Sequence, residues 1–381
     1  MLKGSYPLER FRDVRTPFYC YDTALLERTL QAVSDQLRNR PLWQVHYAVK
    51  ANNNPRILRQ IAQAGLGADC VSGGEVRAAL EAGFPASSIV FAGVGKADWE
   101  ILLGLEKGIG RFNVESVAEP EVIAALAAEK GVVAPVALRV NPDIGAHTLS
   151  GITTGLAENK FGIYHAEIPG VIRKVLSLPS LRFCGLHYHI GSQILDMSDF
   201  MALCNRVTEL RERLSREGLP SGDINVGGGL GIEYAHPNHL PIADFPAYFG
   251  TFKRMLPAAV PVHFELGRSI VAPCGTLIAR VLYVKEGVSR KFAILDAGMN
   301  DLVRPAMYHA VHRIENLSSD GPEEVYDVVG PICESSDVFG KGIVLDQCHR
   351  GDFVAIRSAG AYGESMASCY NSRPLPGALF L

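Results

Sequence analysis

The residues of this chain that could do chemistry each follow a short apolar run. Lys50 ends the run VHYAVK at residues 45–50. A lysine is usually a solvated surface charge, but partial removal from water at the end of a buried strand lowers the pKa of the amine and makes it a nucleophile. Lys50 alone fits both interpretations. Other polar or glycine positions that follow such runs are Asp69, Asn113, Arg139, His189, Gly227 to Gly229 and Glu265.

Three consecutive glycines, Gly227 to Gly229, follow the run at residues 224–226. They either mark a tight turn or leave bare backbone N–H groups that can hold a phosphate. Ser192, directly after Ile190 and Gly191, is a second candidate phosphate donor. A glycine loop alone is a weak signal, so its weight depends on the groups that accompany it.

His187 and His189 alternate on one face of a predicted strand. This spacing raises a metal site as an alternative, but no nearby Cys, Asp or HExxH spacing supplies further ligands. We expect instead a histidine that stacks on a flat ring or is buried and hydrogen-bonded. Glu265 precedes Arg268 by three residues. It either forms a buried pair with that arginine or accepts a hydrogen bond from a protonated ring nitrogen.

A lysine amine, a phosphate-binding loop, a stacking ring and a carboxylate are together what pyridoxal 5′-phosphate requires. The lysine forms a Schiff base, the loop anchors the phosphate, and the carboxylate pairs with the pyridinium. The combination is far more specific than any one member. It predicts this cofactor and no metal.

A repeating series of strands and helices positions these residues. We count eight strand–helix units between about residues 42 and 270, and such alternation predicts a parallel sheet with right-handed crossovers. Eight units favour a closed (β/α)8 barrel, whose active site lies at the carboxyl ends of the strands. The alternative is an open doubly wound sheet, but no GxGxxG fingerprint follows the first strand. One helix is expected to open at Ser116, with Glu119 completing a capping box.

The pattern changes after residue 270. Short strands separated by Gly, Pro and Asp predict a compact all-β domain, and the strand-like N-terminal residues could join it. The predicted fold is therefore α/β, a (β/α)8 TIM barrel plus a C-terminal all-β domain that includes the N-terminal segment. The predicted boundaries are residues 30–270 for the barrel, and residues 1–29 with 271–381 for a domain of β-sandwich or β-barrel type.

Composition excludes several other classes. The 381 residues include 37 Lys and Arg against 40 Asp and Glu, which argues against binding of a polyanion by bulk charge. No apolar run approaches the roughly 18 residues that span a bilayer, and early charged residues predict no signal peptide. The 8 cysteines show no CxxC pair, as expected for reduced thiols. We expect a cytoplasmic globular protein that binds neither nucleic acid nor membrane.

A series of motifs, in order along nearly the whole chain, resembles the diaminopimelate decarboxylase family, within the alanine racemase-like group of pyridoxal-phosphate enzymes. The resemblance implies the same two-domain fold and a homodimer with active sites at the subunit interface. It also implies decarboxylation of meso-2,6-diaminopimelate to L-lysine and CO2, the last step of lysine biosynthesis. The motifs are YAVKAN (47–52), VSGGE (71–75), HYHIGSQ (187–193), GGGLG (227–231), ELGR (265–268), CES (333–335) and AYG (361–363).

The resemblance also implies roles for matching residues. Lys50 would form the Schiff base, and His189 would stack on the cofactor ring. Glu265 would pair with the pyridine nitrogen, where related racemases place an arginine, so that the ring accepts the electron pair left by CO2. Further cofactor contacts are implied for Asp69, Ser192, Gly228, Gly229, Leu266, Gly267, Arg268 and Tyr362.

A second group of residues concerns the substrate. Arg268 and Arg304 offer two guanidinium groups for the carboxylate that stays on the substrate, and Glu334 can pair with its distal ammonium. By resemblance Cys333 protonates the carbanion and, with Glu334, reaches the cofactor from the neighbouring subunit. The remaining predicted substrate contacts are Tyr308 and Tyr362.

Two departures from the family pattern stand out. Leu266 replaces a usual proline, and the chain stops soon after residue 374, which leaves the final strand of the β-domain open. The loop at residues 143–160, with His147, is a candidate lid or pocket wall. The alternatives are a sister decarboxylase of ornithine, lysine, arginine or carboxynorspermidine, a racemase on the same scaffold, or a non-catalytic protein that binds pyridoxal phosphate.

Overall fold

A computed structural model describes residues 3–141 and 160–381 of the chain. The chain divides into two compact units. The first comprises Leu30–Gly231 and Asp244–Gly267, and the second comprises Met1–Thr29, Ile232–Ala243 and Arg268–Leu381. Apart from Lys160, the candidate lid with His147 lies outside the described residues.

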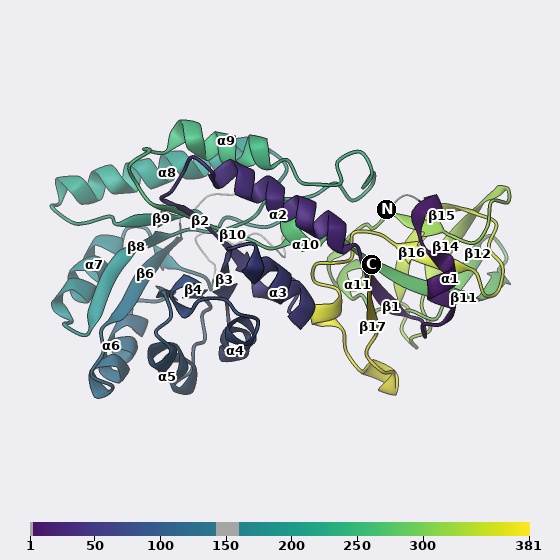
Figure 1. Cartoon of the computed structure of the whole chain (residues 1–381), viewed down its shortest axis with the longest axis horizontal. Coiled ribbons are helices and arrows are strands. Elements are labelled where there is room, and N and C mark those ends of the chain that lie inside the picture. Colours follow the sequence, from purple (N-terminus) through teal and green to yellow (C-terminus); the bar gives the residue numbers. More distant parts are fainter. Residues whose placement is uncertain (1–2, 142–159) are drawn as a thin grey trace. The chain divides into compact units, whose positions relative to one another are not determined.

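The first unit is a closed barrel of parallel strands, which confirms the predicted fold class (Figure 1). Neighbouring strands follow the order β5-β4-β3-β2-β10-β9-β8-β6, and pairing of β5 with β6 closes the ring. A short strand, β7, pairs parallel with the carboxyl end of β6, Val140 opposite Ile163. The bounds are β2 Trp43–Ala48, β3 Gly67–Cys70, β4 Ile89–Phe91, β5 Arg111–Val114, β6 Ala134–Asn141, β7 Ile163–Tyr164, β8 Leu181–His187, β9 Asp223–Asn225 and β10 Val262–Leu266.

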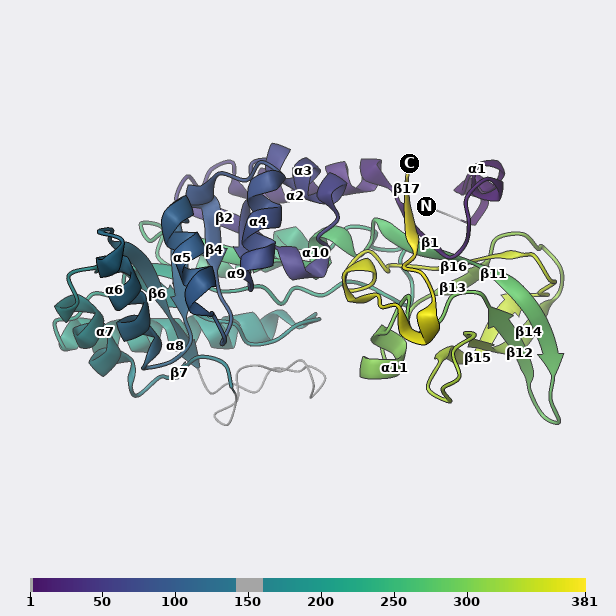
Figure 2. The same cartoon turned by 90° about the horizontal axis from the view of Figure 1, so that it is seen from below.

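Helices cover the outside of the barrel strands, as the views in Figures 1 and 2 show. Because a strand is followed by a helix along the chain, the carboxyl ends of all eight strands meet at one rim. Helix α2 (Thr23–Leu37) precedes the first barrel strand. The others are α3 Pro55–Gln63, α4 Gly73–Glu81, α5 Asp98–Lys107, α6 Glu119–Glu129, α7 Ile168–Ser177, α8 Met197–Arg216 and α9 Phe245–Met255, with 3-10 turns η2 Val49–Ala51 and η3 Ala86–Ser88.

The sequence explains where several of these helices begin. Asn54 caps α3 by accepting the N–H of Arg56, and Pro55 occupies the first helical position, where its missing N–H costs nothing. The expected capping box at Ser116 is wrong. Helix α6 begins at Glu119, and this carboxylate instead accepts the N–H of Glu115 and the amine of Lys96. The ion pair with a buried amine outweighs the local cap.

The second unit is built on an eight-stranded sheet in the order β13-β16-β11-β12-β14-β15, with β1 beside β11 and β17 beside β1. This sheet confirms the predicted β-domain. The strands are β1 Phe18–Tyr21, β11 Gly275–Glu286, β12 Lys291–Leu295, β13 Ile314–Asn316, β14 Glu323–Val329, β15 Val338–Asp346, β16 Phe353–Ile356 and β17 Gly377–Phe380. The helices and 3-10 turns are η1 Lys3–Ser5, α1 Leu8–Arg12, α10 Arg268–Val271, α11 Arg304–Tyr308, η5 Glu364–Met366 and η6 Tyr370–Ser372.

Both ends of the described chain belong to this sheet. Strand β1 pairs antiparallel with β11, Phe18 opposite Ile278, and parallel with β17, Phe18 opposite Gly377. Phe11, Phe18 and Phe353 form edge-to-face contacts in one buried cluster. The N-terminal segment thus shares the core of the second unit. The final strand of the β-domain, which the sequence left undecided, is β17.

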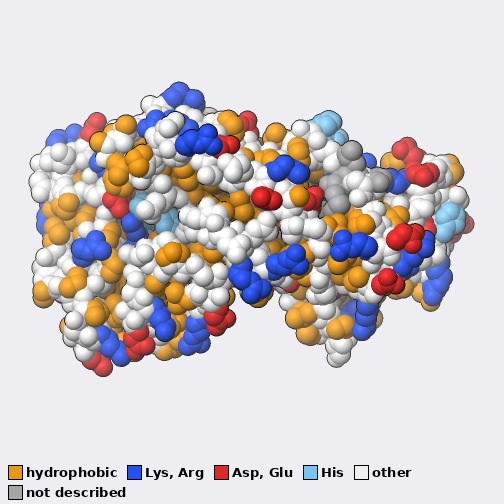
Figure 3. Space-filling model, viewed as in Figure 1, with side chains coloured by type: hydrophobic (Ala, Val, Ile, Leu, Met, Phe, Trp, Pro, Cys, Tyr) orange, Lys and Arg blue, Asp and Glu red, His pale blue; other side chains and the backbone are white. Residues whose placement is uncertain are grey.

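The surface agrees with the near-neutral composition. On the face drawn in Figure 3, basic and acidic side chains are interspersed over both units. Among the helices of the described residues, none has the length and apolar character needed to cross a membrane.

Candidate active site

Lys50 lies at the carboxyl rim of the barrel, in the 3-10 turn that directly follows β2. The hydroxyl of Tyr47 donates to the carbonyl of Asn52 (2.9 Å), and the Asn52 side chain accepts the N–H of Asn54. These bonds fix the turn on both sides of the lysine. The Lys50 side chain keeps 43% of its surface exposed, and its Nζ lies 3.9 Å from Oδ2 of Asp69. The structure therefore brings the predicted nucleophile beside a predicted cofactor contact.

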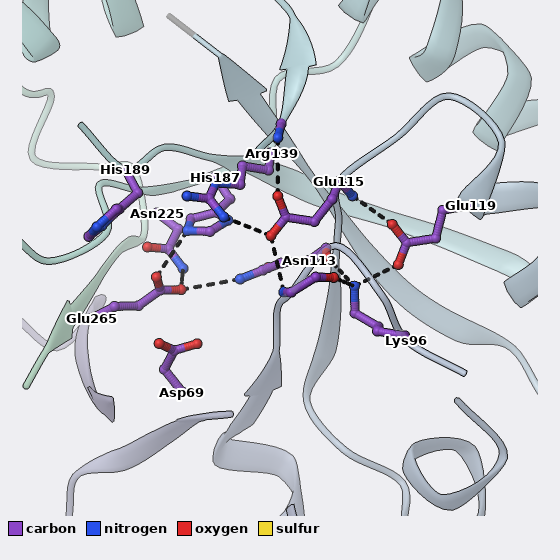
Figure 4. A network of polar contacts seen from close by, with 12 residues as sticks. Asp69, Lys96, Asn113, Glu115, Glu119, Arg139, His187, His189, Asn225 and Glu265 are labelled. Atoms are coloured by element: carbon purple, nitrogen blue, oxygen red, sulfur yellow. Dashed lines mark hydrogen bonds and ion pairs between the residues drawn. The ribbon is translucent and has the colours of Figure 1, made fainter. Parts of the chain in front are cut away.

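Asp69 and Glu265 are two buried carboxyl groups whose pKa values are shifted in opposite directions (Figure 4). Burial, and then the negative charge of Glu265, raise the pKa of Asp69 well above its usual value, against the effect of Lys50. Oδ1 of Asp69 has no hydrogen-bond partner among the described residues. The environment thus favours the protonated form at Asp69 and leaves one of its oxygens open to a further group.

Glu265 receives hydrogen bonds from three barrel strands. Its Oε1 accepts from Nδ2 of Asn113 (3.1 Å) and Nδ2 of Asn225 (2.7 Å), and its Oε2 lies 2.9 Å from Nε2 of His187. Burial alone would raise the pKa of Glu265, but the adjacent His187, with weaker help from His189, lowers it far below the usual value. The carboxylate is therefore held as an anion inside the barrel.

His187 is buried and hydrogen-bonded, which is one of the two arrangements expected for the histidines of this strand. Because the Glu265 carboxylate can only accept, the Nε2 atom of His187 carries the proton in this bond. Its Nδ1 is buried without a hydrogen-bond partner among the described residues. The described residues hold no cluster of potential ligands suited to a metal ion.

His189 lies two residues further, just past the end of β8. Its Nδ1 is 3.3 Å from the backbone N of Gly228, so it accepts that N–H and the ring is neutral. Burial, and then the charges of Arg139 and Lys50, lower the pKa of His189 well below its usual value. A neutral, oriented imidazole is suited to stack on a flat ring.

The Ser192 loop and the glycine loop run side by side at the rim. Ile194 N–H donates to Gly229 O (2.9 Å), and Gly231 N–H donates to Ile194 O (2.9 Å). Gly229 has φ +109°, and a Cβ at this position would lie 2.9 Å from the carbonyl oxygen of Gly191. A Cβ on Gly228 would lie 1.9 Å from the carbonyl oxygen of Glu265. Only glycine fits these positions, because two backbones approach each other directly.

Leu266 ends strand β10 and Gly267 follows it, next to the Lys50 turn. Leu266 is buried and pairs with Tyr47 of β2. A Cβ on Gly267 would lie 3.0 Å from Cβ of Ala51 and 3.1 Å from Cβ of Ala48. These two residues therefore support the backbone of the lysine turn.

A buried carboxylate, Glu115, fastens three further rim segments. Its Oε1 accepts from Nη1 of Arg139 (2.7 Å) and from the N–H of Gly93 (3.0 Å), while its Oε2 accepts the N–H of Gly162 (3.1 Å). The guanidinium of Arg139 also lies 4.7 Å from the ring centre of Phe161. Figure 4 shows this group beside His187 and Glu265. Glu115 thereby orients a cation within the polar interior of the barrel.

The second unit holds both predicted substrate arginines in one buried cluster. Nη1 of Arg268 and Nη1 of Arg304 donate to the same hydroxyl, that of Tyr234, at 2.8 and 3.0 Å. Nη1 of Arg304 also donates to Nε2 of His312 (2.9 Å), and the Arg268 guanidinium lies 5.0 Å from the ring centre of Tyr362. The structure therefore unites Arg268, Arg304 and Tyr362 around a tyrosine that the sequence did not single out.

Three other predicted residues lie elsewhere in the second unit. Tyr308 is the last residue of α11, which Arg304 begins. Cys333 and Glu334 lie on an exposed turn between β14 and β15, where Oε1 of Glu334 accepts the hydroxyl of Tyr370 (2.6 Å). Their exposure leaves both side chains accessible at the surface of the single chain.

Sequence reasoning missed several residues of the site. Asn225 ends β9, and only Val226 separates it from the glycine loop, so the strand-end rule that selected Glu265 could have selected it. Glu115 follows β5 by one residue and offered the same signal. Tyr234 lies in an irregular segment, and no local pattern marks it.

The family model for the pyridoxal binding domain of pyridoxal-dependent decarboxylases matches residues 23–272. Diaminopimelate decarboxylase of Bacteroides thetaiotaomicron is 59% identical over 98% of this chain and 98% of its own. The chain belongs to the diaminopimelate decarboxylase family.

Other members of the diaminopimelate decarboxylase family agree with this assignment. The Zymomonas mobilis enzyme is 42% identical over 94% of this chain and 86% of its own. The crystal structure of the Helicobacter pylori enzyme complexed with L-lysine superposes with a TM-score of 0.93 at 39% identity, covering 99% of this chain and 94% of that one. A protein of this family is a pyridoxal-dependent carboxy-lyase, and its cofactor is pyridoxal 5′-phosphate.

The barrel residues fit the cofactor of the diaminopimelate decarboxylase family. The ring nitrogen requires a buried anion, and Glu265 is one; the aldehyde requires an amine, and Lys50 lies at the rim. Asp69 has an oxygen without a partner among the described residues, directed into the same interior. The glycine loop leaves no room for side chains beside Glu265.

Proposed function

We propose that this protein removes one carboxyl group of meso-2,6-diaminopimelate and yields L-lysine and CO2. The observation that carries this proposal is the 59% identity with a diaminopimelate decarboxylase over 98% of both chains. The buried anion Glu265 supports decarboxylation in particular, because a protonated pyridine ring is the stronger electron sink. The release of lysine places the reaction at the end of lysine biosynthesis.

The barrel residues would bind the cofactor at the carboxyl rim. Lys50 would hold the cofactor aldehyde through its amine. Glu265 binds the ring nitrogen, His189 stacks on the ring, and Asp69 supplies its open oxygen. Ser192, Gly228 and Gly229 would contribute to the phosphate contacts, and Leu266 and Gly267 support the lysine turn. The family resemblance implies further cofactor contacts for Tyr362 and Arg268. When bound, pyridoxal 5′-phosphate supplies an aldehyde and a conjugated ring that accepts the electron pair left by CO2.

The chain holds the proton of the ring nitrogen by electrostatics. Burial makes an isolated carboxylate costly, and three hydrogen-bond donors compensate the charge of Glu265. An anion stabilised in this way favours a proton on the nitrogen that it faces. Because the donors come from β5, β8 and β9, the carboxylate is fixed before any ligand binds and needs little reorganisation.

The second unit would supply substrate selection. Arg268 and Arg304 bind the carboxylate that stays on the substrate, since a pair of guanidinium groups matches that planar anion. Glu334 pairs with the distal ammonium, and Tyr308 and Tyr362 add hydrogen bonds. Cys333 delivers a proton to the carbon from which CO2 has left.

We also propose a cytoplasmic homodimer with shared active sites. The exposed position of Cys333 and Glu334 supports this arrangement, because side chains at the surface of one chain are free to act on a second copy. Mixing Lys50→Ala protein with Cys333→Ala protein tests it. Recovery of activity in the mixture, above that of either variant alone, is expected, since a hybrid dimer holds one intact site. Failure of the mixture to recover, with exchange of subunits verified, would contradict shared sites.

Release of CO2 from meso-diaminopimelate, with ornithine, lysine and arginine alongside, tests the reaction. We expect turnover of meso-diaminopimelate alone and dependence on added pyridoxal phosphate. Preference for another amino acid would retain the fold and cofactor but contradict the proposed substrate role of the arginine pair. No CO2 release from any of the four would favour a non-catalytic protein that binds pyridoxal phosphate.

Borohydride reduction tests the role of Lys50. Reduction of the holoenzyme followed by peptide mapping should find the cofactor attached to Lys50, and Lys50→Ala should lose both the attachment and turnover. Lys253→Ala on helix α9 is the control and should keep both. Appreciable activity in Lys50→Ala would overturn the assignment.

A further inference from the structure

Asn225, the last residue of β9, is hydrogen-bonded on both sides of its amide. Its Nδ2 donates to Oε1 of Glu265 (2.7 Å), and its Oδ1 accepts the N–H of Gly227 (2.9 Å). The side chain is buried, with 1% of the residue exposed. Because one end of the amide must face a donor and the other an acceptor, the two bonds fix its orientation. Asn225 thus touches the carboxylate (Figure 4), and it also touches the first residue of the glycine loop.

Backbone contacts join the same two segments. The N–H of Glu265 donates to the carbonyl of Gly227 (2.8 Å), and the N–H of Val226 donates to the carbonyl of His263 (2.9 Å). A Cβ on Gly228 would collide with the carbonyl oxygen of Glu265. The glycine loop is therefore packed directly on the end of β10, and a small displacement of the loop must move the strand that carries Glu265.

Asn113 provides a natural comparison. Its Nδ2 donates to the same Oε1 of Glu265, at 3.1 Å, from strand β5. Its Oδ1, however, has no hydrogen-bond partner among the described residues. Asn113 therefore stabilises the negative charge of Glu265 without a bond to the glycine loop. Asn225 stabilises the same charge and is also bonded to the loop.

We propose that Asn225 is a positioning residue that couples the carboxylate for the ring nitrogen to the loop for the phosphate. The inference rests on the proposed roles of Glu265 and of the glycine loop. A rigid cofactor contacted at both ends binds well only when the distance between the two contacts is correct, and misplacement by about 1 Å is costly. A neutral amide sets this distance without adding charge beside the anion.

The test is equilibrium binding of two probes to the cofactor-free protein, pyridoxal 5′-phosphate and pyridoxal, which lacks the phosphate. Their affinity ratio measures the phosphate contribution alone. Asn225→Ala should lower this ratio about tenfold, the effect of one lost hydrogen bond to a positioned loop. Asn113→Ala should weaken both probes alike and keep the ratio. This readout does not depend on turnover, and a residue with a merely structural role would weaken both probes equally.

Asn225→Asp provides the second variant. It keeps the acceptor for Gly227 N–H but loses the donor to Glu265 and adds a like charge. Repulsion between the two carboxylates should displace residue 225 together with the Gly227 N–H that it holds, so we expect the ratio to fall here as well. An unchanged ratio in Asn225→Asp would contradict the coupling. This variant also keeps the inference testable if Asn225→Ala does not fold.

The outcomes separate the inference from its basis. An unchanged ratio in Asn225→Ala, or an equal fall in Asn113→Ala, would overturn the coupling role of Asn225. If the unaltered protein bound both probes with equal affinity, and Ser192→Ala left both affinities unchanged, the two loops would not bind the phosphate. That result would overturn the proposed role of the loops together with this inference.

Discussion

The Nε2 atom of His187 lies 2.9 Å from Oε2 of Glu265 in the interior of the barrel. Of the three donors to this carboxylate, His187 alone carries a titratable side chain. The histidine therefore controls how strongly the anion is held, and through it the proton on the group that Glu265 would bind.

Replacement of His187 should reduce the chemical step. His187→Leu removes the donor, so the pKa of Glu265 rises, and we expect kcat to fall about tenfold or more, as for loss of one hydrogen bond to a charged group. His187→Gln keeps an N–H and should lose less. Steady-state kinetics across pH will show the acid limb of kcat moving to higher pH in His187→Leu. A change confined to KM would contradict this role.

Removal of the shared hydroxyl should weaken substrate selection. Tyr234→Phe deletes the acceptor between Arg268 and Arg304, and we expect kcat/KM for meso-diaminopimelate to fall about tenfold. Tyr248→Phe is the matched control, because the buried Tyr248 hydroxyl has no hydrogen-bond partner among the described residues. Equal effects of the two variants would show that the arginine pair does not depend on Tyr234.

Removal of the Glu115 carboxylate should destabilise the barrel. Glu115→Ala leaves the Arg139 charge and two backbone N–H groups buried without this acceptor, and we expect a loss of about 3–5 kcal/mol in the free energy of unfolding. Glu115→Gln retains one oxygen and should lose less. Urea unfolding measures both, with Glu106→Ala at an exposed ion pair with Lys130 as the control that should change little. A loss in Glu115→Ala no larger than in this control would contradict the prediction.

Acid should destabilise the barrel through its buried histidines. His46 is buried within β2, where its Nδ1 contacts Ser88 O (3.0 Å) and its Nε2 contacts Nδ1 of His263 (3.0 Å). Burial, and then the neighbouring His263, lower the pKa of His46 to about 3. Because an unfolded histidine takes up a proton near pH 6.5, unfolding binds protons between that pH and about pH 3, and stability falls as the pH falls through this range.

The magnitude follows from the same linkage. His46 contributes a loss of about 1.4 kcal/mol per pH unit below about pH 6.5, and nothing above it. Urea unfolding at pH 7 and pH 5 measures the slope, and His46→Gln should reduce it. An equal slope in this variant would show that other groups dominate.

Much of the fold could be predicted because its signals are local. The alternation of apolar runs with helices marked the barrel strands, and Lys50, His189 and Glu265 followed from their places at strand ends. The start of α6 could not be predicted in this way, because Glu119 accepts a hydrogen bond from the buried amine of Lys96, 23 residues away. The same applies to Tyr234, which is 34 residues from Arg268 and 70 from Arg304. Contacts between segments distant in sequence decide these positions.

The pairing of β1 with β11 and β17 bears on how the chain matures during synthesis. Strand β1, buried along its whole length, leaves the ribosome long before its partners at Gly275–Glu286 and Gly377–Phe380 exist. The barrel strands, which end at Leu266, can meanwhile assemble among themselves. An apolar strand with open backbone groups is then a target for chaperones or for misassociation with other nascent chains. Translation speed and chaperone supply should therefore influence the yield of this protein mainly through its first thirty residues.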